Sequence, residues 1–539
     1  MENREICNDS SSNIAQNFEL KIMTPLLSIV TPVYDPPRYA FEKCIETVFA
    51  QEFKDWEWCL VDDCSTAPWV KTRLNELQAL DQRVKVYLRS ENGGIVAASN
   101  DAISLTTGEF IVLLDNDDEL HLDALEEVAT CINANPIVDY IYSDEDKITE
   151  DGEHFDEFVK PDWSPERFLA QNYCSHLSVM RTSLLNEVGR FRNGFDGAQD
   201  YDLFLRITEQ TKNIVHIPKV LYHWRAVPGS TASANNAKLY AYTAAAKAVD
   251  EHLKRRRITA EVKFDPALSL VTVNRQLTEH PKVSIIIPTC GTRKSIFGVD
   301  TCLVVNAVES VERRSTYANF EIIVVVDKGT PPQVVADLKA VCPNRLKIID
   351  YDKPFNFSDK CNIGVVNSDA PLILFLNDDT EIISPDWIET MVGHIIEEDV
   401  AMVGPMLLFE DGRIQSAGHS NTHSLHNFCT GLSSNIFGHF RMLKLAREVS
   451  GVTGACALIK RDAYFEVGGM SEIFPLAFND CDIAFKFLER GYRIIWTPNA
   501  RLFHFESATR PANVKPSEVK LLMSRWGRKI NNDQYCKVH

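Results

Sequence analysis

FIVLLDNDD at residues 110–118 is an apolar run that ends in carboxylates, and it returns as LILFLNDDT at residues 372–380. A continuous apolar run of this length is typical of a strand that is buried on both faces of a parallel sheet. The carboxylates then emerge at the carboxyl end of the strand, where open α/β sheets bind their ligands. The sequence therefore predicts an α/β fold with a polar site at the strand ends.

The similarity between the two halves of the chain extends well beyond this run. Further landmarks recur in the same order: LSIVTP at 27–32 and VSIIIP at 283–288, LVDDCS at 60–65 and VVDKGT at 325–330, QDYDLFLR at 199–206 and NDCDIAFK at 479–486, and a histidine between aromatic residues at 222–224 and 503–505. Between the strand-like runs, apolar residues such as Phe41, Cys44, Ile45 and Val48 have the spacing of a helix that crosses between parallel strands. An ordered repeat of this kind predicts two tandem copies of one α/β domain.

We expect five segments along the chain. They are a flexible, polar N-terminal arm (1–25), a first α/β domain (26–236), a helical connector rich in Ala, Lys and Arg (237–279), a second α/β domain (280–510) and a C-terminal tail (511–539). The sequence has no long Gly/Ser linker between the copies, so we expect the two domains to be held close together.

Composition and charge limit the class of protein. With 45% hydrophobic and 24% charged residues, the 539-residue chain has the composition of an ordinary soluble globular protein. Its net charge of −19 excludes nucleic acid as an expected partner, because a polyanion is repelled at long range. The polar N-terminus lacks an apolar stretch of the signal-peptide type, and no apolar run approaches the ~18 residues of a membrane helix. We therefore expect a cytoplasmic protein whose 14 cysteines are reduced thiols.

The carboxylates at the strand ends predict a metal site. Mg²⁺ and Mn²⁺ prefer oxygen ligands, typically one or two carboxylates beside substrate phosphates, and a neutral imidazole suits Mn²⁺ as well. Asp115, Asp117 and Asp118 from one loop and His223 from another supply these donor types. A cation held there would neutralise the charge that develops on a departing diphosphate. The alternative is that His223 and His504 are core histidines, but their recurrence at matching offsets favours the ligand interpretation.

Several of these motifs together resemble a known family. SIVTPVY at 28–34, VDDCS at 61–65, DND at 115–117 and QDYDL at 199–203 resemble the motifs of a family 2 glycosyltransferase of the GT-A fold. The second copy, with NDCD at 479–482, GYR at 491–493 and WTP at 496–498, is similar to the rhamnosyltransferase-like branch of that family. The two stretches cover nearly the whole chain, and their pattern is specific for the family but not for the sugar.

The resemblance implies roles for residues of the first copy. The donor nucleotide would be held by Pro32, Tyr34, Asp63, Asp115 and Asp117, the metal by Asp117, Asp118 and His223, and the catalytic base would be Asp200. The chemistry of a single displacement at an anomeric carbon agrees, because it needs a carboxylate within hydrogen-bond reach of the acceptor hydroxyl.

In the second copy the same resemblance implies a donor contact at Pro288, metal ligands at Asp379 and His504, and a base at Asp480. Two positions depart from the first copy in this alignment. Asn377 stands where Asp115 stands, and Lys328 stands where Asp63 stands. A lysine has no acceptor for the N3–H of a pyrimidine, so this alignment predicts different base recognition in the two copies.

Three features remain open from sequence. Asp202 and Asp482 are expected to orient the start of a helix, since Asp favours the first turn. Asp144–Asp146 is interpreted either as a loop on the acceptor side or as a solvated turn. The basic and apolar tail at 519–530 would either pack on the second domain or lie on an anionic membrane surface that presents a lipid-linked acceptor.

The sequence thus predicts a bifunctional, Mn²⁺- or Mg²⁺-dependent, inverting glycosyltransferase. It would transfer sugars from UDP- or dTDP-linked donors to a glycan or lipid-linked glycan of a surface polysaccharide, of the O-antigen or capsule type, in the cytoplasm or at the cytoplasmic face of the inner membrane. One active copy beside an acceptor-binding pseudo-enzyme is the closest alternative. A nucleotidyltransferase and a non-catalytic scaffold are more distant ones.

Overall fold

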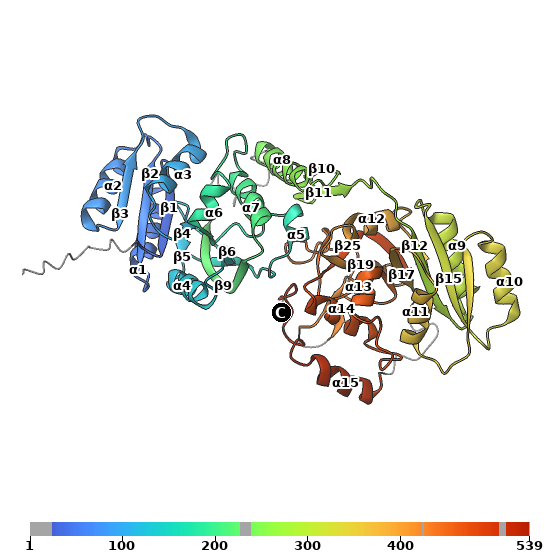
Figure 1. Cartoon of the computed structure of the whole chain (residues 1–539). Helices are drawn as coiled ribbons and strands as arrows, with labels where there is room; N and C mark the ends of the chain where they lie inside the picture. Colours follow the sequence, from blue (N-terminus) through green and yellow to red (C-terminus); the bar gives the residue numbers. More distant parts are fainter. Residues whose placement is uncertain (1–23, 227–238, 423–424, 506–513, 538–539) are drawn as a thin grey trace, which may run out of the picture.

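The structure, a computed structural model, describes residues 24–226, 239–422, 425–505 and 514–537 (Figure 1). The predicted N-terminal arm, apart from its last two residues, lies outside the described residues. The described chain forms two large sheets, one in each half of the sequence, with a helix and a hairpin between them (Figure 1).

The first sheet has nine strands, and eight of them follow the order β3-β2-β1-β4-β8-β6-β9-β5, with β7 paired to β6. Its strands are β1 (Leu27–Val33), β2 (Trp56–Asp62), β3 (Val84–Leu88), β4 (Phe110–Leu113), β5 (Glu119–Leu120), β6 (Tyr140–Ile148), β7 (His154–Phe158), β8 (Ser178–Arg181) and β9 (Ile214–Arg225). Its helices are α1 (Arg38–Ala50), α2 (Pro68–Leu80), α3 (Gly94–Leu105), α4 (Ala124–Ala134), α5 (Pro165–Ala170), α6 (Thr182–Glu187) and α7 (Gln199–Gln210). The neighbours β1, β2, β3 and β4 are parallel, as the apolar runs predicted.

The second sheet repeats this order strand for strand, as β16-β15-β12-β17-β24-β19-β25-β18, with β20 paired to β19 and β23 to β25. Its strands are β12 (Val283–Thr289), β15 (Phe320–Asp327), β16 (Leu346–Tyr351), β17 (Leu372–Leu376), β18 (Thr380–Ile382), β19 (Val400–Leu408), β20 (Ile414–Ser416), β23 (Arg447–Glu448), β24 (Cys456–Lys460) and β25 (Arg493–His504). Its helices are α9 (Leu303–Arg314), α10 (Pro332–Val341), α11 (Phe357–Val366), α12 (Trp387–Ile395), α13 (Arg461–Glu466) and α14 (Asn479–Glu489). Two tandem copies of one α/β domain are thereby confirmed.

The second half also carries small additions, which are the hairpins β13 (Arg293–Ile296) with β14 (Val299–Cys302) and β21 (His419–Ser420) with β22 (His426–Asn427), and a 3₁₀ turn at His439–Arg441. In both halves the central strands are buried along their whole length, as in β2, β12 and β17. Apolar side chains on each face of the sheets pack against helices, so each sheet is the middle layer of its domain.

The segments outside the two sheets differ from the prediction in one respect. The connector is helical only in α8 (Leu239–Arg255) and continues as the antiparallel hairpin β10 (Ala260–Asp265) and β11 (Leu270–Arg275). The tail forms α15 (Pro516–Trp526), where the buried Leu522 packs against Phe474 of the second domain. This packing favours the first of the two interpretations of the tail. Within the described parts of the chain, no helix has both the length and the apolar character to cross a membrane.

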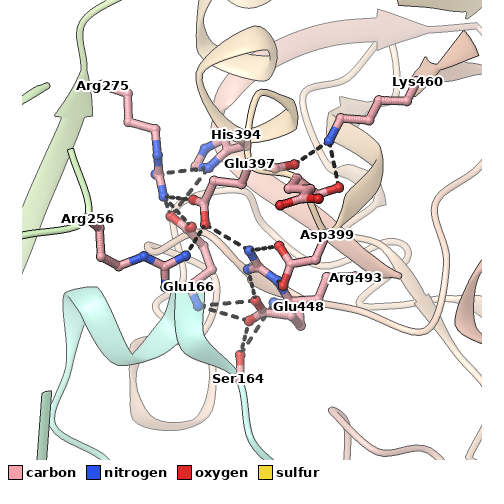
Figure 2. Close-up of polar contacts among 11 residues, drawn as sticks. Ser164, Glu166, Arg256, Arg275, His394, Glu397, Asp399, Glu448, Lys460 and Arg493 are labelled. Carbon is pink, nitrogen blue, oxygen red and sulfur yellow. Dashed lines mark hydrogen bonds and ion pairs between the residues drawn. The ribbon is translucent and has the colours of Figure 1, made fainter. Parts of the chain in front are cut away.

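A buried ionic network joins both domains and the connector (Figure 2). Arg275 of β11 donates to both carboxylate oxygens of Glu166 in α5 at 2.8 and 2.7 Å, and to Glu397 after α12 at 2.7 Å. Arg493 of β25 donates to Glu397 at 2.9 Å and to Glu448 at 2.8 Å. Burial alone would raise the pKa of Glu166, but Arg275 holds it well below its usual range. The charges of the network therefore compensate one another across the junction.

Glu448 of the second domain also holds the start of α5 in the first domain. Its carboxylate accepts hydrogen bonds from the backbone N–H of Glu166 at 3.1 Å and from the hydroxyl of Ser164, and its side chain has no exposed surface (Figure 2). It thus satisfies a backbone donor that the helix itself leaves unpaired.

We expect Glu448→Ala to lower the free energy of unfolding by about 3 kcal/mol or more, because it leaves Arg493 buried without this partner and uncaps α5. Urea denaturation measures the effect. Glu398→Ala, at an exposed position nearby, is the control and is expected to change the value by less than about 0.5 kcal/mol. Equal stability of the two variants would contradict the role of the junction.

Candidate active sites

The first candidate site is a cavity of about 60 Å³ at the carboxyl ends of β1 and β4. Polar groups from distant parts of the chain line it, namely Asp115 after β4, His176 before β8, Asp200 at the start of α7 and Tyr222 of β9, beside Pro32 of β1. The structure thus brings the predicted Pro32, Asp115 and Asp200 to one place. The site lies where the sheet topology predicts a ligand.

The carboxylates after β4 differ in their surroundings. Asp118 is buried and accepts hydrogen bonds from the hydroxyl of Tyr222 at 2.6 Å and from the backbone N–H of Arg225 at 2.8 Å. Burial, with Asp117 close by, raises the pKa of Asp118 well above its ordinary value. Burial and the charge of Asp115 raise the pKa of Asp117 to about 6. Three carboxylates this close favour a cation between them, since like charges repel.

His176 is the imidazole that lies with these carboxylates. Asp115, Asp118 and His176 each have one donor atom that lies within 4.8 Å of the donor atoms of the other two. Nδ1 of His176 also lies 3.4 Å from Glu145 of β6. Burial alone would lower the pKa of His176, but Glu145 and the aspartates raise it to about 9. When a cation displaces the proton of His176, the set offers two carboxylates and one neutral imidazole, which are donors that Mn²⁺ accepts.

Asp200, the predicted base, stands in the first turn of α7 and faces the cavity. The side-chain amide of Asn172 donates to its Oδ2 at 2.9 Å. Burial raises the pKa of Asp200 above its ordinary value of 3.8. A carboxylate with a raised pKa is a stronger proton acceptor, as general-base catalysis requires.

This shift predicts the pH dependence of the first site. A base works only when it is ionised, so activity is present above the raised pKa of Asp200 and is lost as the pH falls through it. The acid limb of the rate profile is therefore expected above pH 3.8. Asn172→Ala removes a hydrogen bond to the ionised form and should move the limb to still higher pH. The pH dependence of the rate is measured in Asp480→Asn protein, which keeps the first site, with and without Asn172→Ala. An acid limb at or below pH 3.8 in both of these proteins would contradict the assignment of Asp200 as the base.

Asp63 lies directly after β2, is buried, and its carboxylate is already bonded. It accepts from the backbone N–H groups of Gly93 at 2.9 Å and Gly94 at 2.8 Å and lies 2.9 Å from Nε of Arg89. Gly94 has φ of 80°, in the region that favours glycine, so the two glycines serve as a cradle for Asp63 at the start of α3. Tyr34, also predicted on the nucleotide, is half exposed after β1.

The alignment of Asp63 with Lys328 is wrong by one residue. Leu27 of β1 pairs with Trp56, and Val283 of β12 pairs with Phe320, so the residue equivalent to Asp63 is Asp327. Asp327 lies 2.8 Å from the buried Nζ of Lys360, while Lys328 is exposed. In both copies the residue at this position is therefore an aspartate paired with a basic side chain. The predicted difference in base recognition rested on Lys328 at this position and is no longer supported.

The second site brings Asp379 and His504 together as predicted. Oδ1 of Asp379 lies 3.3 Å from Nε2 of His504, and Nδ2 of Asn377 lies 3.3 Å from the same nitrogen. Burial would raise the pKa of Asp379, but His504 holds it below its ordinary value. Among the described residues, the buried Oδ1 of Asn377 has no hydrogen-bond partner, so this site offers an amide oxygen beside a carboxylate and an imidazole. These donors fit a hard divalent cation. Pro288 lies in β12, as Pro32 does in β1.

Asp480, the second predicted base, stands in the first turn of α14, as Asp200 does in α7. Its carboxylate accepts hydrogen bonds from the backbone N–H of Gly454 at 3.1 Å and of Cys481 at 2.8 Å, and Oδ2 lies 3.8 Å from Nε2 of His419. Asp202 and Asp482 are fully buried two residues further on. Asp202 is bonded to Arg192 and Arg206, and Asp482 to Trp526, and both aspartates lie in the first turn of a helix as predicted.

His223 does not lie with Asp117 and Asp118. Thr380 of the second copy is equivalent to Asp118 of the first. Thr380 pairs with His504, whereas it is the next residue of the first copy, Glu119, that pairs with His223. His504 therefore corresponds to Trp224 and not to His223. A shift of one residue along a strand moves a side chain to the other face of the sheet. His223 accordingly contacts Asp146 of β6, its Nδ1 at 2.6 Å from the carboxylate. The sequence carries a signal of this shift, because His223 is five residues after Pro218 and His504 six after Pro498.

The interpretation of Asp144–Asp146 as a loop or a solvated turn is wrong. These residues lie within β6 and are buried. Their carboxylates contact side chains from other segments, Asp144 with His216 at 2.8 Å and Glu145 with Lys160 at 3.0 Å.

His176 and Asn172 were missed because no short motif marks them, and only the tertiary structure brings them to the site.

Comparisons with known proteins place the chain in a family. A match to the family described as Glycosyl transferase family 2 covers residues 28–189 and 284–468. The chain is 40% identical to the "Uncharacterized protein y4gI" of Sinorhizobium fredii over 93% of its own length and 56% of that protein, and 34% identical to the "O-antigen biosynthesis protein RfbC" of Myxococcus xanthus over 91% of its length and 38% of that protein. It thus spans about half or less of the length of these relatives.

Among solved structures, S. aureus TarS is 20% identical, with a TM-score of 0.33 over 43% of this chain and 72% of that one. The family match falls once in each half, on the two sheets that share one strand order. The motifs at the strand ends that indicated the family therefore belong to two GT-A domains, and the chain is a member of glycosyl transferase family 2.

Proposed function

We propose that the chain is a bifunctional, metal-dependent, inverting glycosyltransferase with one active site in each domain. It takes UDP- or dTDP-linked sugars as donors and extends a surface polysaccharide of the O-antigen or capsule type. The family match in each half and the relation to a protein named for O-antigen biosynthesis support this proposal.

One observation carries the proposal. In both domains an aspartate in the first turn of an equivalent helix, Asp200 or Asp480, accompanies a carboxylate and imidazole set at the strand end, Asp115, Asp118 and His176 in one case and Asp379 with His504 in the other. A base and a site for a diphosphate-bound cation are the two parts that an inverting displacement needs. A base at an equivalent position in both copies favours two active sites, and each copy adds a carboxylate and an imidazole, although the imidazoles come from different segments of the fold.

Each group then has a distinct task. Asp200 and Asp480 accept the proton of the acceptor hydroxyl as its oxygen attacks the anomeric carbon from the face opposite the diphosphate, which inverts the configuration. When bound, Mn²⁺ or Mg²⁺ neutralises charge on the leaving diphosphate. Asp115, Asp118 and His176 would hold the ion in the first domain, and Asp379, His504 and the amide oxygen of Asn377 in the second. Pro32 and Pro288, with Tyr34 and the bonded Asp63, line the side of the nucleoside.

The closest alternative is a single active site. The second copy has Asn377 and Thr380 where the first has Asp115 and Asp118, so its set carries fewer charges for a cation. A copy that binds the acceptor without catalysis would tolerate this loss.

The proposal is tested by incubating the purified chain with Mn²⁺ and a panel of nucleotide-sugars and acceptors. Release of nucleoside diphosphate is the expected result. Release of pyrophosphate instead would indicate nucleotidyl transfer. The absence of any release with every donor and acceptor would contradict the proposal and favour a scaffold.

A further inference from the structure

The structure holds a further cluster of side chains that can bind a metal, separate from the carboxylates of the two candidate active sites. It consists of Asp146 of β6, His154 at the start of β7 and His223 of β9, whose donor atoms all lie within 4.8 Å of one another. We propose that these three residues form a zinc site on the face of the first sheet opposite the catalytic site.

The sheet itself sets the geometry of the cluster. The strands β7, β6 and β9 are neighbours, and Asp146 pairs directly with His223 across β6 and β9. One oxygen of Asp146 lies 2.6 Å from Nδ1 of His223, and the other lies 2.8 Å from Nδ1 of His154. The two imidazole rings stand 4.6 Å apart, nearly perpendicular. A carboxylate between two imidazoles is thus held in place by backbone pairing before any ion arrives, which lowers the cost of binding.

The cluster is distinct from the catalytic set. Side chains along a strand alternate between the faces of a sheet. Tyr222, the neighbour of His223 in the chain, points to the catalytic face, where its hydroxyl bonds Asp118 and its ring stacks on His176. His223 therefore points to the other face. An ion between Asp146 and His223 cannot be the ion between Asp115, Asp118 and His176.

The donor set selects the class of metal. Two imidazoles and one carboxylate are typical ligands of Zn²⁺, whereas Mg²⁺ and Ca²⁺ prefer sets made of oxygens. The side chain of His154 is 54% exposed, so the ion has a path from solvent and His154 can rotate to close the shell. His121 has its ring 6.0 Å from that of His223 but is not among the donors that lie within 4.8 Å of one another. Three protein ligands with an open position are a known form of zinc site.

Zinc would also tie the β6–β7 hairpin to the sheet. The turn after β6 is closed by Thr149, whose backbone N–H donates to Glu153 at 3.0 Å, and Arg225 donates to the carbonyl of Thr149 at 3.0 Å. Arg225 also donates to the carbonyl of Asp117 at 3.1 Å. Binding of an ion only to the folded form stabilises that form by mass action, so zinc is expected to raise the thermal midpoint.

The test measures zinc binding to the full chain by equilibrium dialysis and calorimetry in excess Mg²⁺, which competes for the oxygen-rich catalytic sets. One zinc equivalent and a raised thermal midpoint are expected for the parent protein. His154→Ala and His223→Ala should each weaken this binding at least 10-fold, and His154→Asn, at an exposed position, repeats the test without a risk to folding. His176→Ala and His280→Ala, the latter at an exposed histidine before β12, should retain it.

Two results would overturn the proposal. The first is a parent protein that binds no zinc under these conditions, which would leave the cluster as a hydrogen-bonded network. The second is zinc binding that His176→Ala abolishes and His154→Ala leaves intact, which would put the ion in the catalytic set. Neither result depends on sugar transfer, so the inference stands or falls separately from the proposed function.

Discussion

Asp200→Asn is expected to slow transfer at the first site by ~10²-fold or more, because it keeps the shape of the side chain and removes the proton acceptor. Asn172 still has an oxygen to donate to, so the helix start is expected to remain intact. The rate of nucleoside diphosphate release with the acceptor of the first site measures the loss. Asp196→Asn, at an exposed position just before α7, is the matched control and should leave the rate unchanged.

The same change in the second copy, Asp480→Asn, is expected to cause a loss of similar size at the other linkage. Its neighbours differ, since backbone N–H groups of Gly454 and Cys481 bond Asp480 where a side-chain amide bonds Asp200. If Asp480→Asn leaves every transfer step intact, the second domain is not catalytic in the way we propose, and its role as an acceptor-binding copy becomes the better interpretation.

Removal of divalent cations is expected to reduce turnover at both sites by at least ~10²-fold, since a bound cation contributes several kcal/mol of charge stabilisation in the transition state. Protein stripped with a chelator and then supplied with Mn²⁺ should regain its rate. His176→Ala should raise the Mn²⁺ concentration needed by the first site, and His504→Ala that needed by the second. His223→Ala is the control for both. Undiminished turnover in chelator, after bound metal has been removed, would count against the metal-dependent mechanism.

The fold was predictable because burial on both faces restricts the core strands to apolar residues. A strand buried on both faces, such as β4 or β17, must be apolar along its length, and its carboxylates can only emerge at its end. Two such runs in the same order are sufficient to predict two copies of one domain. The start of α7 and α14 was predictable for a similar reason, since Asp202 and Asp482 lie in first turns where their charge is favourable.

The errors in the site have a physical cause as well. Local similarity aligned Lys328 with Asp63 and His504 with His223, and each alignment was displaced by one residue. In a strand such a displacement reverses the face of every side chain, so a short motif cannot assign a side chain to a site unless the register is anchored. Anchors exist at Trp56 and Phe320 and at Pro218 and Pro498, outside the motifs themselves.

Other residues of the site were not predictable from local pattern at all. The three consecutive charges of Asp144–Asp146 are typical of a solvated turn, yet they form a buried strand because His216, His223 and Lys160 from other segments contact them. His176 likewise enters the catalytic set only through the pairing of β4 with β8. Such partners are defined by tertiary contacts and leave no periodic signal in the chain.

The presence of two separate catalytic sites in one chain is tested by complementation between Asp200→Asn and Asp480→Asn proteins. Each protein is incubated with the donors and acceptors that support diphosphate release, and the linkages in the product are determined by NMR. Each variant is expected to make one linkage only, the two linkages are expected to differ, and a mixture of the two proteins is expected to restore both. Loss of the same linkage in both variants, or survival of both linkages in either one, would contradict two separate sites.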